Sequence, residues 1–356
     1  MSRLRPLAAV IAFLAVGPLL LLLAGTIPFL LASNLVVFAL FALAATGLVL
    51  IMGFSGQVSL GHAAFYGIGA YTSAILTVEA GWSPLLAVVV GVVISGLVAA
   101  ALGRAVFRLS GHFLAMATLA FGLFFFYLLG FLDITGGNGG RGGIPKLAFG
   151  SFEVLTDERM FLLVWVLLGV GVLIARNVVQ SATGRALRAT GSSEVAAACS
   201  GVNIVRVKVG VFVVGALYAS LAGSLYAHWV TYIAPDAFGL LTSIQFLVIA
   251  TVGGLGTVWG AIVGAAFVVG ISELTREVVP LFVEGATGSY ETVAYGAALI
   301  LVLVAFHKGI ADAVLDAVGR RSRSARLAPA AAAGAEVGTT IDSAPPAETG
   351  VQKQVR

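Results

Sequence analysis

The chain has 356 residues, of which 60 % are hydrophobic and only 10 % are charged, and its formal net charge is +4. A water-soluble domain needs more polar side chains to cover its surface, so this composition excludes that class. Repeated apolar runs of about 18 residues or more instead predict an all-α fold, that of a polytopic integral membrane protein. The basic residues lie between these runs and at the chain ends, which gives no indication of a nucleic-acid partner.

Ten apolar runs follow one another along the chain. The first, Leu7 to Leu31, follows a short basic start and could be the core of a signal peptide. Its length favours an uncleaved first transmembrane helix within residues 1–32. The transmembrane domain, 33–312, holds nine more runs: Leu35–Met52, Ala63–Ala80, Leu85–Phe107, Phe113–Leu132, Met160–Ile174, Val209–Trp229, Leu241–Val252, Ala261–Val279 and Thr292–Phe306. Residues 313–356, rich in Ala, Pro and Ser, are expected to form a disordered cytoplasmic tail.

The basic residues indicate how these runs are oriented, because cytoplasmic loops carry an excess of Lys and Arg. With ten spans and a cytoplasmic N-terminus, sixteen of the 20 basic residues fall on the inside. The four on the outside are Arg141, Lys146, Arg159 and Arg276. If one helix were added or left out, every later loop would change sides and the bias would be reversed for those loops. The ten-span topology is therefore favoured, and both termini are expected to be cytoplasmic.

A first glycine-rich break interrupts the apolar pattern between Gly53 and His62. Irregular backbone at membrane depth is tolerated only where it is buried in protein or lines a wet cavity. Close helix packing explains the glycines but not the polar residues Ser55, Gln57, Ser59 and His62, which supply hydrogen-bonding groups without fixed charge. These residues, with Tyr71, are candidates for a translocation pathway; the alternative is that they only satisfy a kinked helix or an inner loop.

Three other features favour structural roles. A second break, Gly253 to Gly260, has few polar residues, and close packing is expected there. The glycine-rich segment Thr135 to Pro145 is not followed by a helix with Gly-Lys-Ser/Thr, so a cluster of tight external turns is expected instead of a phosphate site. Glu273, inside an apolar run, has Arg276 one turn later, and a local ion pair near the outer interface is favoured over a role in substrate binding.

The coupling loop, 178–208, is a basic segment between two apolar runs. Ser192 is expected to cap a short helix that Gly201 ends, with Glu194 in its first turn. Val195, Ala198, Cys199 and Val202 give that helix one apolar face. Such a helix outside the membrane could dock in a groove of a partner; the alternative is an ordinary basic loop.

Chemistry that would make the chain an enzyme is absent from the sequence. It contains no Gly-x-x-x-x-Gly-Lys-Ser/Thr, no His-Glu-x-x-His and no Gly-x-Ser-x-Gly motif. Cys199 is the only cysteine and the four histidines have no ligand spacing, so neither a metal nor another cofactor is expected. The remaining class is a pore or carrier. Since the runs hold few ionisable residues, an energy source on another chain fits better than ion coupling.

A resemblance covers about Gly47 to Ala313, most of the chain, and several blocks of sequence carry it: Gly53–Tyr71, Thr118–Gly122, Thr135–Pro145, Gly184–Arg188, Ser220–Ala227 and Gly253–Gly264. They resemble the permease subunits of ATP-binding-cassette importers for branched-chain amino acids. The resemblance implies a second, similar permease, two cytoplasmic ATP-binding subunits and an extracytoplasmic solute-binding protein, in a bacterial inner membrane. It also implies that ATP is hydrolysed by the separate subunits.

The resemblance assigns contact with the ATP-binding subunits to residues of the coupling loop: Arg185, Arg188, Glu194, Ala197, Gly201 and Asn203. The chain departs from the family at Leu123, where members often have an acidic residue. Urea or a short amide is therefore an alternative substrate to a hydrophobic amino acid. An ion-coupled secondary carrier and a channel without an ATPase are the alternatives outside this class.

Overall fold

The computed structural model describes residues 4–24, 31–107, 112–149 and 152–282, with a few isolated helical positions between 293 and 300. It is helical apart from short strands and turns, so the predicted all-α fold is confirmed. The tail predicted for 313–356 lies outside the described residues, as does nearly all of the tenth run, Thr292–Phe306. The apolar helices are α1 (Leu4–Ala24), α2 (Ala32–Ser55), α3 (His62–Val78), α4 (Pro84–Val106), α5 (His112–Phe131), α6 (Asp157–Gln180), α9 (Ile204–Val230), α10 (Leu240–Gly253) and α11 (Gly260–Phe282).

Each of the first nine predicted runs coincides with one of these helices. Six described segments are long and apolar enough to cross a membrane: α2, α4, α5, α6, α9, and α10 together with the 3-10 turn η3 (Pro235–Phe238) before it. The 17-residue α3 is shorter than these. The chain is thus a multi-pass membrane protein, and the count of ten crossings stays a prediction.

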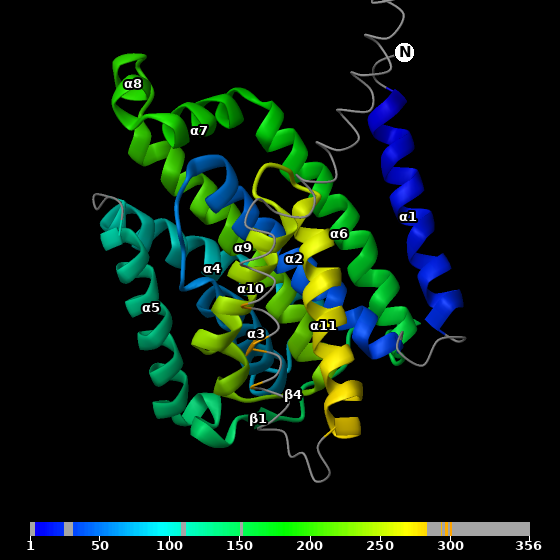
Figure 1. The fold of residues 1–356 in the computed structure, drawn as a ribbon. Helices are drawn as coiled ribbons and strands as arrows, with labels where there is room; N and C mark the ends of the chain where they lie inside the picture. The colour runs from blue at the N-terminus through cyan, green and yellow to red at the C-terminus, as the bar shows by residue number, and fades with distance from the viewer. Residues whose placement is uncertain are drawn as a thin grey trace, which may run out of the picture. The chain divides into compact units, whose positions relative to one another are not determined.

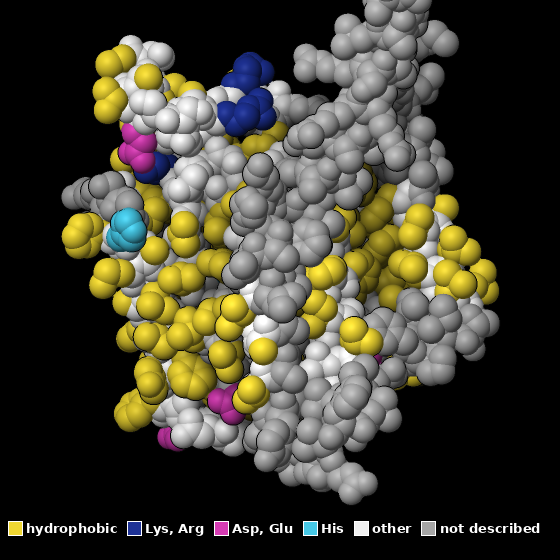
Figure 2. All heavy atoms as spheres, in the orientation of Figure 1, with side chains coloured by type: hydrophobic (Ala, Val, Ile, Leu, Met, Phe, Trp, Pro, Cys, Tyr) yellow, Lys and Arg dark blue, Asp and Glu magenta, His cyan; other side chains and the backbone are white. Residues whose placement is uncertain are grey.

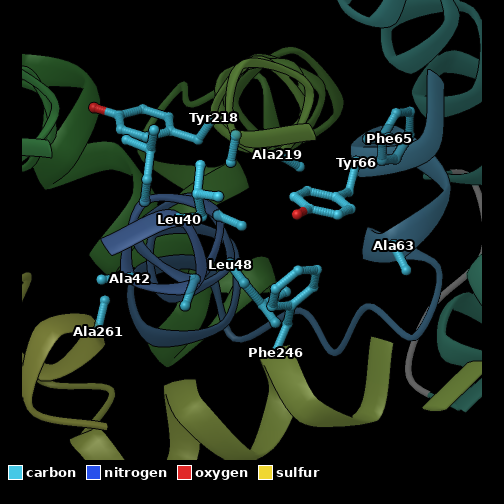
Figure 3. Close-up of a cluster of buried hydrophobic side chains, with 14 of the residues drawn as sticks. Leu40, Ala42, Leu48, Ala63, Phe65, Tyr66, Tyr218, Ala219, Phe246 and Ala261 are labelled. Atoms are coloured by element: carbon cyan, nitrogen blue, oxygen red, sulfur yellow. The ribbon is translucent and has the colours of Figure 1, made fainter. Parts of the chain in front are cut away.

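Helix α2 forms the centre of the bundle. Its most apolar 18-residue window is 89 % buried, whereas the corresponding windows of α4 and α5 are 28 % and 22 % buried. A helix that is apolar all round must be enclosed by protein, and α2 packs on α6, α9, α10 and α11. In the core, α2 side chains such as Leu40 and Leu48 lie between those of α9 and α10 (Figure 3).

Small residues allow α3 and α9 to approach closely. A Cβ at Gly69 of α3 would overlap the carbonyl oxygen of Ser220, and one at Gly223 of α9 would overlap that of Tyr66. At the second break, a Cβ at Gly253 would overlap the carbonyl oxygen of Gly260. The packing role predicted for this break is confirmed, since α10 and α11 meet there backbone to backbone.

Two more helices, α7 (Ala182–Ser192) and α8 (Glu194–Cys199), lie between α6 and α9 at one end of the bundle (Figure 1). The opposite end holds β1 (Arg141–Gly142) paired with β4 (Tyr232–Ile233), and also β2 (Ala148–Phe149) paired with β3 (Phe152–Glu153). We call these the α8 end and the β1 end. Helices α2, α6 and α10 run toward the α8 end, and α5, α9 and α11 run toward the β1 end (Figure 1).

The β1 end contains the glycine-rich segment. Gly136, Gly137, Gly140 and Gly143 have positive φ angles between 57° and 83°, so the predicted cluster of tight turns is confirmed. Arg141 bonds the carboxylate of Glu79 just after α3, and His228 Nδ1 lies 2.7 Å from the carbonyl oxygen of Pro145. These contacts tie the segment to α3 and α9.

Candidate functional site

The first glycine-rich break descends from the α8 end into the middle of the bundle. Helix α2 ends at Ser55, and Gly56 follows in the left-handed conformation with φ 67°. Extended chain then leads to His62, whose Nε2 lies 3.1 Å from the carbonyl oxygen of Ala44, near the middle of α2. The sequence therefore places irregular backbone deep inside the fold, as its glycines predicted.

Neighbouring helices hold this irregular segment in place. Leu60 N–H donates to Thr118 Oγ1 of α5 at 3.1 Å, and Ala63 N–H donates to Ser243 Oγ of α10 at 3.0 Å. A Cβ at Gly61 would overlap the carbonyl oxygen of Thr118. Thr118 and Ser243 thus supply bonds that the extended backbone cannot form with itself. Neither was predicted to have this role, although Thr118 begins one of the blocks in the family resemblance.

The predicted pathway residues differ in how their polar atoms are satisfied. Ser55 Oγ donates to Ile51 O at 2.5 Å within α2, which is a structural role. By contrast, Gln57 and Ser59 are 4 % and 2 % exposed, and their side-chain polar atoms have no hydrogen-bond partner among the described residues. The same holds for His62 Nδ1 and for the hydroxyl of Tyr71. Buried polar atoms are normally paired, so this group is chemically unusual.

A pocket of about 210 Å³ lies near this segment, between α2, α3, α9 and α10. Its wall contains Val37, Phe41, Tyr66, Tyr226 and Thr242. The ring of Phe246, which packs on Phe41 and Tyr66, also lies edge-on to His62 at a centroid distance of 6.0 Å. None of the five predicted pathway residues lines this pocket. We call it the aromatic pocket.

The coupling loop folds differently from its prediction at one point. Ser192 is the last residue of α7, and its hydroxyl donates to Arg188 O at 3.0 Å, so the predicted cap at Ser192 is wrong. Ser193 caps α8 instead, by accepting from Ala196 N–H at 3.3 Å. The two serines are chemically equivalent, and the choice is made by α7, which continues through Ser192.

The predicted end of α8 is confirmed. Gly201 has φ 81°, and the N–H groups of Gly201 and Val202 donate to Ala198 O and Ala197 O at 2.9 Å and 3.1 Å. This pattern satisfies the last carbonyls of the helix and requires a left-handed residue at position 201. Glu194, in the first turn, accepts from Lys208 Nζ at 2.6 Å. The side chain of Lys208 is only 4 % exposed, a burial that the sequence did not predict.

The other predicted coupling residues have contacts of their own. Arg185 and Arg188 donate to the carbonyl oxygens of Gln180 and Val179, at the end of α6. Asn203 Oδ1 accepts from Arg206 N–H at 3.0 Å and so caps α9. Ala197 is 2 % exposed and faces the protein. These hydrogen bonds and this burial show how the loop is held together within the chain. That the loop binds a partner stays a prediction.

Three of the four residues predicted to form the apolar face of α8 are exposed, whereas Val202, beyond the end of the helix, is half-buried. Val195 is 76 % exposed and Cys199 is also exposed. Figure 2 shows hydrophobic side chains gathered at this tip of the molecule, with basic side chains over the neighbouring α7. An exposed apolar face on a well-capped helix has the chemistry of a contact surface.

The structure brings the coupling loop and the irregular segment together. A Cβ on Gly191, near the end of α7, would lie 3.2 Å from the carbonyl oxygen of Phe54 and 3.4 Å from the carbonyl carbon of Ser55. Thus α7 packs on the backbone where α2 ends. The two candidate sites, more than 110 residues apart in the sequence, are parts of one structure.

Comparison with known proteins gives one family. The family model described as "Branched-chain amino acid transport system / permease component" matches residues 30–303. The chain is 30 % identical over 262 residues to the high-affinity branched-chain amino acid transport system permease protein LivM of Salmonella typhimurium, which covers 65 % of this chain and 60 % of that protein. It is 30 % identical over 293 residues to Escherichia coli LivM, covering 72 % of this chain and 67 % of the relative.

A second kind of relative is the permease protein LivH of the same transport system in Escherichia coli. The identity is 27 % over 292 residues, covering 76 % of this chain and 90 % of LivH. The chain thus spans less than two thirds of Salmonella LivM but most of LivH. No solved structure matches the chain significantly. Because the family model covers well over half of the sequence, the chain belongs to the family of branched-chain amino acid transport system permease components.

Proposed function

We propose that the chain is a permease subunit of an ATP-driven importer of the bacterial inner membrane, with a branched-chain or other hydrophobic amino acid as cargo. The names of LivM and LivH support this class of cargo. In this proposal a second, similar permease completes the membrane part, and an extracytoplasmic protein delivers the solute. Two cytoplasmic subunits hydrolyse ATP, so this chain carries no catalytic residue and needs no cofactor.

The contact of Gly191 with the end of α2 is the observation that carries the proposal. An ATP-driven permease needs a surface for the ATPase and a rigid connection from it to the solute path. Helix α7 provides the connection, because its last turn packs on the backbone of Phe54 to Gly56. Gln57 and Ser59 follow immediately. A movement of α7 and α8 therefore shifts the segment that carries these polar groups.

We assign the ATPase contact to α8 and to the exposed basic residues Arg185 and Arg188 of α7. Val195 and Cys199 give the exposed apolar surface, and Arg185 and Arg188 give positive charge beside it. An amphipathic helix of this kind fits a groove on a partner. Since Arg104 of α4, Arg176 of α6, and Arg206 and Lys208 of α9 also lie toward the α8 end, that end is the cytoplasmic one in this proposal.

We assign the solute path to the region of Gln57, Ser59, His62 and Tyr71, with Ser55 at its cytoplasmic edge. A zwitterionic solute that leaves water must find hydrogen-bonding groups, because unmatched polar atoms cost several kcal/mol in an apolar medium. The unpaired Gln57 amide, the Ser59 and Tyr71 hydroxyls and the Nδ1 atom of His62 supply hydrogen-bonding groups without fixed charge. Neutral groups bind weakly, which suits a path that must release its cargo.

A substitution on α8 tests the proposed coupling role. Val195→Asp places a charge in the apolar surface and should abolish co-purification of the ATPase subunits while the permease still inserts in the membrane. Ile134→Asp, on a residue 52 % exposed at the β1 end, is the matched control and should leave the complex intact. Normal ATPase association of Val195→Asp would contradict the assignment of α8.

A further inference from the structure

A second pocket, of about 200 Å³, lies between α2, α10 and α11 toward the β1 end. It is smaller than the roughly 300–1,000 Å³ typical of sites for drug-sized molecules, so it suits a small solute. Its wall has an apolar part formed by Val37, Phe41, Val268 and Val269. The rest of the wall is polar and includes Asn34, Gln245, Glu273 and Arg276. We call it the polar pocket.

The two charged residues in this wall are only loosely paired. Arg276 Nη1 lies 3.8 Å from Glu273 Oε2, which is an ion pair but is longer than a hydrogen bond. The side chain of Glu273 is 14 % exposed and that of Arg276 is 69 % exposed. The local ion pair predicted from the sequence is thus confirmed. The two groups do not hydrogen-bond to each other, so both can still bond to a solute. Both groups also border a pocket, which the sequence could not show.

Asn34 adds an unsatisfied donor. Its Nδ2 atom is buried and has no hydrogen-bond partner among the described residues, although the side chain lines the polar pocket. A buried N–H group without an acceptor is costly, and such groups in folded proteins normally have a partner. A solute that brings an acceptor oxygen to Asn34 removes this cost.

From these observations we infer that the polar pocket is a binding site for the transported amino acid on the extracytoplasmic half of the permease. The ammonium group of the amino acid bonds Glu273, and its carboxylate accepts from Asn34 Nδ2 and Arg276. The branched side chain packs on Phe41 and Val268. The class of solute rests on the proposed function, whereas the position rests on the charges, the unpaired amide and the apolar wall.

The polar pocket adjoins the aromatic pocket. It shares Val37 and Phe41 with the aromatic pocket, so the two lie on adjoining faces of α2. The aromatic pocket leads to Tyr66 and Phe246, and Phe246 packs on His62. An amino acid that leaves Glu273 thus enters surroundings with hydroxyl groups and no charged residue in the wall, which favours passage over retention.

A photoreactive leucine analogue carrying a diazirine tests the position directly. The complete transporter, in nanodiscs of phosphatidylcholine only, is irradiated with the analogue, and the labelled peptides are mapped. Label on α2 and α11 that excess leucine displaces is the expected result. Leucinamide, which lacks the carboxylate, and 4-methylpentanoate, which lacks the ammonium, should displace about tenfold less, since each loses a charge-assisted bond. Leucine-displaceable label confined to other helices would overturn the assignment.

Two variants separate binding from structure. Glu273→Gln should lower labelling of the pocket about tenfold or more. Asn34→Leu should also lower it, and should leave the thermal stability equal or higher because it removes an unpaired buried donor. Thr275→Ala is the control on the same helix. Thr275 donates to Ile271 O and is not in the pocket wall, so labelling should not change.

Reversal of the pair, Glu273→Arg with Arg276→Glu, gives the sharpest comparison. If the pair has only a structural role, the reversed pair restores labelling and uptake; in a binding site it restores neither. A zwitterionic lipid headgroup has similar chemistry, so label displaced by phosphatidylethanolamine but not by leucine would also overturn the inference. If the parental transporter takes up leucine and Glu273→Gln does so at the same rate, the assignment of the polar pocket is overturned but the proposed function is not. If the parental transporter shows no ATP-driven uptake, the proposed function is overturned.

Discussion

Lys208 Nζ lies 2.6 Å from Glu194 Oε1, and this ion pair joins α8 to the beginning of α9. The side chain of Lys208 is almost fully buried, whereas that of Glu194 is 47 % exposed. A buried ammonium without a counter-charge is strongly unfavourable. The pair therefore fixes the orientation of α8 relative to a helix that packs on α2, α3 and α4.

Glu194→Gln should weaken the anchoring of α8, because it leaves the Lys208 ammonium buried without its counter-charge. We expect a loss of about 1–3 kcal/mol in the stability of this region and reduced ATPase association. Thermal unfolding of the purified complex and co-purification of the ATPase measure the two effects. The double variant Glu194→Gln with Lys208→Met removes both charges and should recover most of the loss. A double variant as unstable as the sum of its single variants would show that the pair is not coupled.

Gly201→Val should misdirect α8 while sparing the membrane helices. Gly201 has φ 81°, where a β-branched side chain costs on the order of 1 kcal/mol or more. Gly210→Val is a matched control, because a Cβ at either position meets nothing within 4 Å and Gly210 has an ordinary helical backbone. We expect normal insertion of both variants, with loss of ATPase association and uptake only for Gly201→Val. Equal behaviour of the two variants would refute the role of the left-handed turn.

Gln57→Leu separates a transport role from a structural one. Both polar atoms of the Gln57 amide are buried without a partner, so an apolar side chain of similar size should keep or raise stability, by about 1 kcal/mol or more. Uptake should fall, because the solute loses a hydrogen-bonding group. Ser55→Ala, which removes a bond made within α2, is the comparison and should affect uptake less. Parental uptake rates in Gln57→Leu, Ser59→Ala and His62→Ala alike would remove this segment from the path.

The orientation of the chain can be tested with its single native cysteine. Cys199 is exposed on α8, so in cells that express the permease without the ATPase subunits a membrane-impermeant thiol reagent should label it only after the cells are permeabilised. In a Cys199→Ser background, Ser83→Cys should label in intact cells, because exposed Ser83 lies between α3 and α4 at the β1 end. Labelling of both positions from the same side would contradict the proposed topology.

The helices of this fold were predictable because apolar runs long enough to span a bilayer can hardly be anything else. The glycine-rich breaks were predictable for a related reason, since Gly56 and Gly254 adopt backbone conformations that other residues resist. Ser192 and Ser193 show the limit of local patterns. Either serine can cap a helix, and the preceding helix α7 decides between them.

The remaining features depend on residues that are far apart in the sequence. In the sequence, Lys208 looks like one more basic loop residue. Its ion pair with Glu194 forms only because the fold places α8 beside the beginning of α9. The polar pocket needs Asn34, Gln245 and Glu273, which three different helices bring together. Likewise, the contact of Gly191 with Phe54 joins two segments that have no local reason to meet. Local sequence patterns thus predict the helices and their ends, whereas these contacts and pockets are determined by how the helices pack together.

The source of energy is the most direct test of the proposed function. Proteoliposomes that contain the permease, its partner permease and the ATPase subunits are supplied with solute-loaded binding protein outside and ATP inside, and leucine uptake is followed. Uptake should require ATP and persist when ionophores collapse the proton and sodium gradients. Uptake that continues without ATP but stops with the ionophores would contradict the proposal and identify an ion-coupled carrier.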